Sequence, residues 1–236
     1  MKISIVIPCY NEENGIKPLI SELEKLQMPH DAVEWIFVQN GSRDQTGAKL
    51  RQFTAAHPEM SIVEVPVNQG YGYGIKQGLK AASGNYLGWI HADLQFSPME
   101  IQKAYDKLWQ MNEPGRVLLK GLRRNRPIVD RLFTFGMSCY ETLLLKCGLH
   151  DINAQPCIFS RDLYDLWDEL APDDFSLDLY AYYLAKKSNA QIVRWPVQQS
   201  ERKAGVSTWN TGMRSRWVVI RRTIAFSRKL KHQLNQ

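Results

Sequence analysis

Residues 86–95 read YLGWIHADLQ, an apolar run that leads directly into alternating polar positions. The apolar part predicts a buried strand over 85–90. Because alternate residues of an extended chain point the same way, we expect His91, Asp93 and Gln95 to share one face just beyond that strand. Nitrogen and oxygen donors in this pattern are typical of a divalent-cation site, and a solvated turn is the plain alternative.

The rest of the first half predicts an α/β domain around that strand. β-branched and apolar runs indicate earlier strands at residues 2–8, 33–38 and 61–65. Helical patterns follow these runs and end near residues 27, 56, 82 and 111. This alternation predicts a Rossmann-type, mostly parallel central sheet with helices on both faces. Ligands bind beyond the carboxyl ends of such strands, where we expect the loops at 8–13, 39–44 and 91–95.

The composition is that of an ordinary globular chain, with 44% apolar and 23% charged residues among 236. That length suits one large domain or a domain with an extension. The four cysteines show no metal-finger or redox-pair spacing, and we interpret them as reduced thiols of a cytoplasmic protein. No signal peptide is expected, and no apolar run approaches the roughly 20 residues that span a bilayer.

Charge is unevenly distributed along the chain. The first 115 residues contain 10 Lys and Arg against 13 Asp and Glu, whereas the remainder contains 20 against 11. After Glu201 there are nine basic residues and no acidic one. A basic second half indicates an anionic partner, which could be a phosphate group, a membrane surface or a nucleic acid. No nucleic-acid-binding motif accompanies this charge, so no nucleic-acid partner is expected.

Four blocks in order resemble the motifs of glycosyltransferase family two, whose members are nucleotide-sugar enzymes of GT-A fold. The blocks are residues 5–13, residues 37–46, residues 68–70 with Gly78, and residues 91–95. They resemble, in turn, the family's opening strand and nucleotide-binding loop, its second acidic block, its third block and its metal motif. The resemblance covers roughly residues 1–130 and implies an α/β, GT-A-like fold that binds a UDP- or GDP-linked sugar.

The resemblance also implies where the donor binds. Carried over residue by residue, the donor-binding positions are Pro8, Tyr10, Glu12, Asn40, Ser42, Gly70, Arg202 and Ser207. The last two belong to a segment, residues 202–207, that is similar to a late Arg-x-x-Gly-x-Ser motif beside the donor diphosphate. Asn40 stands where the family usually has an acid, so it can hydrogen-bond a ribose or base edge without adding charge.

The metal motif departs from the family at its first position. His91 replaces an acid. Because imidazole is a softer ligand than carboxylate, this replacement favours Mn²⁺ over Mg²⁺ as the bound cation. Asp93 is the first-choice ligand and a catalytic residue, with His91 and Gln95 beside it. Negative charge grows on the leaving diphosphate during glycosyl transfer, and a divalent cation at that oxygen stabilises the transition state.

The second half of the chain indicates which class of acceptor the protein uses. After an expected strand at 117–121, Arg123, Arg126 and Arg131 form either a phosphate clamp for the acceptor or a solvated basic surface. Residues 151–161 occupy the place of an acceptor-site motif of the polyprenyl-phosphate glycosyltransferases, a group that includes dolichyl-phosphate mannose synthase, and the match is partial. The resemblance therefore points to a lipid phosphate as acceptor.

Asp178 falls where the wider family places its catalytic base. A carboxylate in the first turn of a helix is also favourable simply through the helix dipole. A sugar hydroxyl needs a general base, whereas a phosphate monoester, with a second pKa near ~6, is already an anionic nucleophile at neutral pH. Asp178 is therefore expected to be a base for a hydroxyl acceptor and an orienting group for a lipid phosphate.

Residues 209–231 predict a basic amphipathic helix, either an interfacial membrane helix or one that packs its apolar side on the domain. We divide the chain into a glycosyltransferase domain, 1–208, with a donor half at 1–115 and an acceptor half at 116–208, followed by this helix at 209–236.

Together these observations predict a metal-dependent, inverting hexosyltransferase of cell-envelope glycan biosynthesis. Its acceptor is a polyprenyl phosphate and its site is the cytoplasm, at the cytoplasmic face of the membrane; inversion comes from the resemblance. Two alternatives stay open. The acceptor could be a sugar hydroxyl of a surface polysaccharide or lipopolysaccharide, or the chain could bind nucleotide sugars without catalysis.

Overall fold

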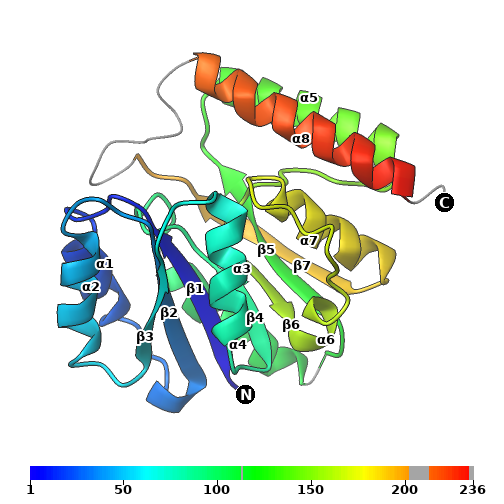
Figure 1. The fold of residues 1–236 in the computed structure, drawn as a ribbon. Helices are drawn as coiled ribbons and strands as arrows, with labels where there is room; N and C mark the ends of the chain where they lie inside the picture. Colours follow the sequence, from blue (N-terminus) through cyan, green and yellow to red (C-terminus); the bar gives the residue numbers. More distant parts are fainter. Residues whose placement is uncertain (113, 202–212, 234–236) are drawn as a thin grey trace.

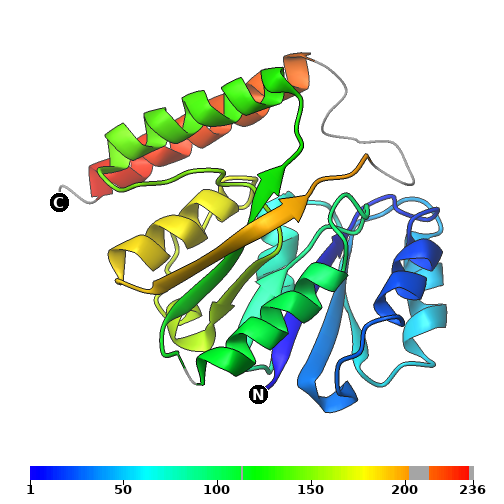
Figure 2. The ribbon, with the colours of Figure 1, turned by 180° about the vertical axis from the view of Figure 1, so that it is seen from behind.

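The computed structural model describes residues 1–112, 114–201 and 213–233. In this part of the chain the centre is a seven-stranded sheet with the order β3-β2-β1-β4-β6-β5-β7. Helices cover both of its faces, as Figures 1 and 2 show from opposite sides. The predicted α/β architecture, with a mostly parallel central sheet, is therefore confirmed.

Residues 1–112 form parallel strands where the apolar runs predicted them. The strands are β1 (Ile3–Cys9), β2 (Val33–Asn40), β3 (Met60–Val65) and β4 (Tyr86–Trp89). The helices are α1 (Ile16–Leu23), α2 (Thr46–Thr54), α3 (Tyr71–Ala81) and α4 (Met99–Met111), with a 3-10 turn at His30–Ala32. Because β1 pairs in parallel with β2 and β4, and β2 with β3, the four carboxyl ends meet at one edge of the sheet.

The second half extends the same sheet. Its strands are β5 (Val117–Arg124), β6 (Cys157–Ser160) and β7 (Gln191–Gln198). Its helices are α5 (Ile128–Leu145), α6 (Arg161–Tyr164), α7 (Leu177–Lys187) and α8 (Met213–Gln233). The strand at 117–121 was predicted, and α8 matches the helix expected near the C-terminus. The boundary proposed at residues 208 and 209 lies outside the described residues.

Strand β6 runs against its neighbours and thereby places the segment before it. It pairs antiparallel with both β4 and β5, and Cys157 lies opposite both Trp89 and Lys120. The residues just before Cys157 therefore lie at the edge where β4 ends. Close pairing on both sides of β6 requires glycine, because a Cβ at Gly88 would collide with the Cys157 carbonyl and one at Gly121 with the Gln155 carbonyl.

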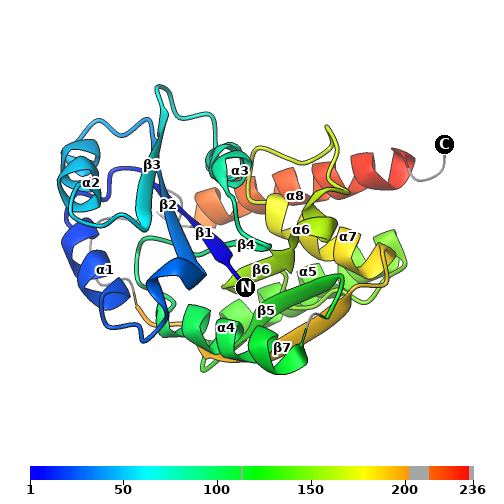
Figure 3. The same ribbon diagram turned by 90° about the horizontal axis from the view of Figure 1, so that it is seen from below.

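Alternate residues of the strands point to opposite faces of the sheet and pack in two apolar layers. Ile3, Ile5 and Ile7 of β1 pack in the layer that holds the buried faces of α1, α2 and α4. Val6 of the same strand packs in the other layer, with α3, α6, α7 and α8. Figure 3, viewed from below, shows α4 on one side of the sheet and α3 and α7 on the other.

Helices α5 and α8 lie side by side over the upper edge of the domain (Figures 1 and 2). Phe226 and Leu230 of α8 pack toward the domain, and the ring of Phe226 lies 6.2 Å from that of Tyr180 in α7. The later part of the apolar half of α8 is therefore packed on the domain, whereas Trp217 and Val218 at its start are exposed. None of the described helices is both long and apolar enough to cross a bilayer.

Glu141 of α5 is buried against α8, and its carboxyl group has no charged partner among the described residues. Burial raises the pKa of this carboxyl from 4.5 to about 7, although the nearby Ser227 hydroxyl opposes the shift. The folded protein therefore holds this proton at pH values where the unfolded chain has released it. Stability must fall as the pH rises through the window between 4.5 and about 7.

We predict that Glu141→Gln removes this pH dependence and raises the unfolding free energy at pH 8 by on the order of 3 kcal/mol. Below pH 4.5 the wild-type carboxyl is protonated in both states, so the variant should gain little there. Urea denaturation at both pH values measures the difference. Glu169→Gln, at an exposed position, is the matched control and should change neither value. Equal stability of wild type and Glu141→Gln at pH 8 would contradict the prediction.

Candidate active site

The loops after β1 and β2 are joined by hydrogen bonds at the carboxyl edge of the sheet. The Asn11 amide donates to Oγ of Ser42 at 3.1 Å, and the Asn11 side-chain oxygen accepts from the Arg43 amide at 2.9 Å. One residue further along, the Glu12 amide donates to Oγ1 of Thr46 at 2.7 Å. Asn11 has a φ of 53°, a left-handed conformation that asparagine tolerates well. These bonds make the two loops one fixed wall.

A cavity of about 560 Å³ lies against this wall, beyond the ends of β1, β2 and β3. It is lined by Tyr10, Gly41, Ser42, Arg43, Pro66, Val67 and Asn68. Gly41 has a φ of 71°, and its missing side chain lets the β2 loop approach the backbone at Val67 and Asn68. An aromatic ring, an arginine and backbone groups around such a volume suit a planar, polar ligand such as a nucleoside.

Two of the predicted donor-binding residues, Tyr10 and Ser42, line this cavity, whereas Asn40 and Gly70 support the structure beside it. Asn40 is buried, and its side-chain nitrogen donates to the Gly70 carbonyl at 3.1 Å. Gly70 has a φ of 125°, and a Cβ there would collide with the Asp173 carbonyl. This pair fixes the start of α3 between β2 and the loop before α7.

Four further residues were predicted to bind the donor, and two of them lie in the described part of the chain. Pro8 lies within β1, and Glu12 is buried in the loop that follows it. Arg202 and Ser207 lie outside the described residues.

The expected extended arrangement of His91, Asp93 and Gln95 was wrong. Strand β4 ends at Trp89, and residues 92–96 form turns and bends, with Leu94 at a φ of 56°. The Gln95 amide donates to Oδ1 of Asp93 at 3.1 Å, and the Gln95 carbonyl accepts from the Ser200 amide at 2.8 Å. The three side chains remain close in sequence, but a turn, not strand alternation, sets their directions.

His91 is joined to a buried network that the sequence did not reveal. Its Nε2 lies 2.9 Å from the hydroxyl of Tyr71, the first residue of α3. That hydroxyl lies 3.4 Å from Oδ2 of Asp178, in the first turn of α7. Burial and the nearby Asp178 carboxylate raise the pKa of Tyr71 well above its usual value, so the phenol stays protonated. The Tyr71 ring also stacks on Phe175, with centroids 4.4 Å apart.

Asp178 forms a fully buried ion pair with Lys120 of β5. Nζ of Lys120 lies 3.2 Å from Oδ1 of Asp178, and the exposed fractions of the two side chains are 0% and 2%. Lys120 also donates to the Ala154 carbonyl at 2.8 Å, and Nε2 of Gln155 donates to the same Asp178 oxygen at 3.0 Å. Both charges are therefore hydrogen-bonded, as burial of an ion pair requires. A lysine within the apolar run of β5 was the one visible sign of this pair in the sequence.

The three arginines predicted to clamp an acceptor phosphate differ in their partners and in their burial. Arg123 pairs with Asp151: Nε donates to Oδ1 at 2.6 Å and the backbone amide to Oδ2 at 2.7 Å. The arginine in turn holds the pKa of the Asp151 carboxyl below its usual value. Arg126 donates to Oγ1 of Thr134 at 2.6 Å, and Arg131 is exposed on α5. Thus the charge of Arg123 is already paired, Arg126 is half-buried, and Arg131 is exposed.

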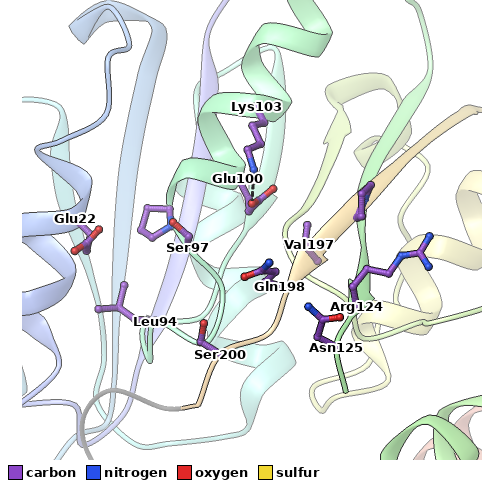
Figure 4. Close-up of a pocket in the computed structure, with 12 residues that line it drawn as sticks. Glu22, Leu94, Ser97, Glu100, Lys103, Arg124, Asn125, Val197, Gln198 and Ser200 are labelled. Carbon is purple, nitrogen blue, oxygen red and sulfur yellow. Dashed lines mark hydrogen bonds and ion pairs between the residues drawn. The ribbon is translucent and has the colours of Figure 1, made fainter. Parts of the chain in front are cut away.

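A second cavity, of about 590 Å³, lies on the α4 side of the same edge. Leu94, Ser97 and Pro98 from the turn after β4 form one wall, and the ends of β5 and β7 form another, with Arg124, Asn125 and Gln198 (Figure 4). Its lining charges are mixed, since Glu100 is bonded to Lys103 at 2.8 Å and Glu22 lies across from them. This cavity adjoins the Asp93 turn on the side away from Tyr71 and Asp178.

The fold is shared with solved glycosyltransferases. Over 95% of this chain and 76% of the other, it superposes on a glucosyl-3-phosphoglycerate synthase from Mycobacterium tuberculosis in complex with Mn²⁺, UDP and phosphoglyceric acid, with a TM-score of 0.73 and 21% identity. A mannosyltransferase from Pyrobaculum calidifontis in complex with GDP-Man and Mn²⁺ gives a TM-score of 0.67 and 18% identity, over 97% of this chain and 64% of the other. These likenesses show that the fold is GT-A-like, as the resemblance implied.

Proteins similar to this chain in sequence are also named as sugar transferases. A dolichyl-phosphate beta-glucosyltransferase of Trichomonas vaginalis is 23% identical over 84% of this chain and 64% of its own length. An undecaprenyl-phosphate 4-deoxy-4-formamido-L-arabinose transferase of Pseudomonas fluorescens is 34% identical over 52% of this chain and 36% of its own length. The chain thus spans less than two thirds of the length of either relative.

The family model for glycosyl transferase family 2 matches residues 4–131, from β1 into the first turn of α5. That match includes the linked β1 and β2 loops, the 560 Å³ cavity and the Asp93 turn. Since it covers more than half of the 236 residues, the protein belongs to glycosyl transferase family 2.

Proposed function

We propose that this protein transfers a hexosyl unit, with inversion, from a nucleotide-diphosphate sugar to a polyprenyl phosphate. The observation that carries the proposal is the cavity beyond β1, β2 and β3, because it contains the predicted donor residues Tyr10 and Ser42 and opens at the same sheet edge as Asp93. The names of the two relatives, which both act on polyprenyl phosphates, support the acceptor.

The donor half of the proposal assigns the base and ribose to this cavity. Tyr10 supplies an aromatic surface, while Ser42 and the backbone around Gly41 supply hydrogen-bonding groups. Asn40 and Gly70 act indirectly, by holding α3 against the cavity. The diphosphate would then extend toward the Asp93 turn, with Glu12, Pro8, Arg202 and Ser207 as the further donor-side positions that the family resemblance assigns.

The donor set of the Asp93 turn fits a divalent cation that shares its coordination with a diphosphate. The described residues contain no group of three His, Cys, Asp or Glu side chains able to hold a metal alone. One carboxylate, one imidazole and one amide, completed by phosphate oxygens, is nevertheless a suitable set for Mn²⁺ or Mg²⁺. Such a cation would stabilise negative charge on the leaving diphosphate.

Tyr71 orients His91 for this role. When the Tyr71 hydroxyl donates to Asp178, Nε2–H of His91 donates to the Tyr71 oxygen, and the imidazole lone pair is then on Nδ1. A fixed hydrogen bond on one ring nitrogen sets the tautomer and the direction of the other. His91 would thus offer Nδ1 to a cation, with Tyr71 and Asp178 as positioning residues.

The burial of Asp178 supports a phosphate acceptor over a hydroxyl acceptor. A general base must reach the proton that it removes, directly or through one water. Asp178 is 2% exposed, and its two oxygens are already engaged by Lys120, Gln155 and Tyr71. In this arrangement Asp178 orients other groups, which is sufficient for a lipid phosphate that is already anionic at neutral pH. We place the reaction in the cytoplasm, at the membrane surface where such a lipid is presented.

We predict that nucleotide binding raises the melting temperature and that the rise depends on the cation and on Asp93. A ligand that binds only the folded state stabilises it by mass action. UDP and GDP are each titrated with Mn²⁺, Mg²⁺ or a chelator and followed by scanning fluorimetry. Asp93→Asn should weaken the cation-dependent affinity at least about tenfold, because it removes the carboxylate ligand. The nucleotide that gives the larger shift identifies the donor class.

The matched control is Asp106→Asn, on the exposed face of α4, which should bind like wild type. Tyr10→Ala should weaken nucleotide binding equally with and without metal, because Tyr10 contacts the cavity and not the cation turn. No shift with any nucleotide and cation would contradict the proposed donor site, and it would equally contradict nucleotide-sugar binding without catalysis.

We predict that Asp178 is required for stability more than for turnover. Asp178→Asn leaves Lys120 charged and unpaired in the interior, which costs about 3–5 kcal/mol of unfolding free energy. The double variant Lys120→Met with Asp178→Asn removes both charges and should recover most of that loss. Its turnover with a polyprenyl phosphate acceptor should stay within about tenfold of wild type. Chemical denaturation and radiolabelled transfer assays measure the two quantities separately.

The hydroxyl alternative gives a different result for the same double variant. If Asp178 is a general base, turnover falls by roughly 10²–10⁴ even where stability is recovered, while hydrolysis of the donor by water continues. That pattern would move the acceptor to a sugar hydroxyl of a surface glycan.

A further inference from the structure

Helix α5 exposes an apolar stripe along its whole length. Ile128, Leu132, Phe135, Cys139 and Leu143 recur every three or four residues and so lie on one side of the helix. Ile128, Leu132, Phe135 and Leu143 have exposed fractions of 73%, 64%, 69% and 79%. Asp130 and Glu141 lie on the opposite side of the helix, and Arg131, one turn before Phe135, lies at the edge of the stripe. Monomeric proteins seldom leave an apolar surface of this extent uncovered unless it binds something.

Helix α8, which lies beside α5, has a basic exposed face. The exposed positions of its described part include Arg221, Arg222, Arg228 and Lys229, and Trp217 and Val218 are exposed at its start. The two helices are joined where Nε of Arg228 donates to the Tyr140 hydroxyl at 3.3 Å. They begin at the same end of the domain and run in the same direction, as both views show (Figures 1 and 2). The exposed apolar residues at the start of α5 therefore lie near Trp217 and Val218.

We propose that the α5 stripe and the α8 basic face together form a surface that docks on an anionic phospholipid bilayer. The stripe enters the interface between headgroups and acyl chains, and the basic face binds the headgroup phosphates. This inference rests on the proposed function for its setting, because a polyprenyl phosphate is presented by a membrane. It departs from the expectation for residues 209–231, since Phe226 and Leu230 of α8 pack on the domain and the helix proposed to insert is α5.

Charge favours a bilayer over a second copy of this chain as the occupant. Two copies that met through the α5 stripe would bring their α8 basic faces together, and like charges across an interface weaken association. The sequence after Glu201 contains nine basic residues and no acid to offset them. An anionic leaflet complements this charge, and each basic residue near its surface strengthens binding about fivefold.

The position of the surface agrees with delivery of a lipid-linked acceptor. Only three residues separate the end of β5 from the start of α5, so the first turn of α5 stands beside the carboxyl edge of the sheet. Arg124 and Asn125, at that end of β5, line the 590 Å³ cavity beside the Asp93 turn. A bilayer against the first turns of α5 would therefore hold a lipid phosphate near the edge where the donor is proposed to bind.

The test is co-flotation of the full chain with phosphatidylcholine vesicles, with and without phosphatidylglycerol, in the absence of donor and acceptor. We expect binding to the anionic vesicles that weakens with added salt. Leu132→Glu with Phe135→Glu should reduce binding at least about a hundredfold, because two large apolar side chains are lost from the interface. Arg221→Gln with Arg222→Gln should reduce it about thirtyfold.

The matched control is Trp109→Glu on α4, where the exposed fraction is 68%, comparable to those of the stripe. It should bind vesicles like wild type, and all variants should keep the wild-type melting temperature, because the substituted side chains are exposed. Equal binding of the Leu132 and Phe135 variant and of wild type would overturn the proposal. So would light scattering that showed a dimer abolished by the same variant, since a second copy would then cover the stripe.

Failure here is distinguishable from failure of the proposed transfer. Transfer is measured with a short-chain, water-soluble polyprenyl phosphate, which needs no membrane. If the wild-type chain transfers the sugar but does not bind anionic vesicles, the proposed function stands and the docking surface is refuted.

Discussion

The buried ion pair between Lys120 and Asp178 is the constraint on which the rest of the site depends. Two opposite charges in a protein interior are stable only when hydrogen bonds satisfy both of them. Here the Ala154 carbonyl and the Gln155 amide supply those bonds, and both belong to the segment that leads into the antiparallel strand β6. The pair can form only if β5, β6 and α7 are packed together at the carboxyl edge, so it ties the second half of the chain to one arrangement. Through Tyr71 the same arrangement determines where His91 lies.

Much of the first half followed from the sequence, because there local pattern and tertiary structure agree. The strands β1, β2, β3 and β4 are short apolar runs bounded by polar loops, and parallel pairing brings those loops to one edge. The placement of Tyr10 and Ser42 beside one cavity follows from that rule. The hydrogen bonds that fix the loops, between Asn11 and Ser42 for example, join residues that are 31 apart in the chain.

The features that the sequence did not reveal depend on long-range pairing or on a single backbone angle. Lys120 and Asp178 are 58 residues apart, and no periodicity connects them. Arg123 was expected either in a phosphate clamp or on a solvated basic surface, because nothing local indicated Asp151 as its partner. The extended arrangement expected after β4 was wrong because the strand ends at Trp89, ahead of a left-handed residue at Leu94. Apolar residues of α5 were passed over because exposure is a tertiary property that hydropathy alone does not contain.

The proposed membrane surface is connected to the site through both partners of the Lys120–Asp178 ion pair. Helix α5 continues from β5, the strand that contains Lys120, and α8 packs through Phe226 on Tyr180 of α7, two residues after Asp178. Both helices of the surface are therefore attached to the two partners of the same ion pair. In the proposed reaction, a lipid phosphate held at the membrane must meet a sugar held beside the Asp93 turn to within a fraction of an ångström for in-line attack. A buried, fully hydrogen-bonded pair at the junction gives that rigidity where a flexible linker would lose it.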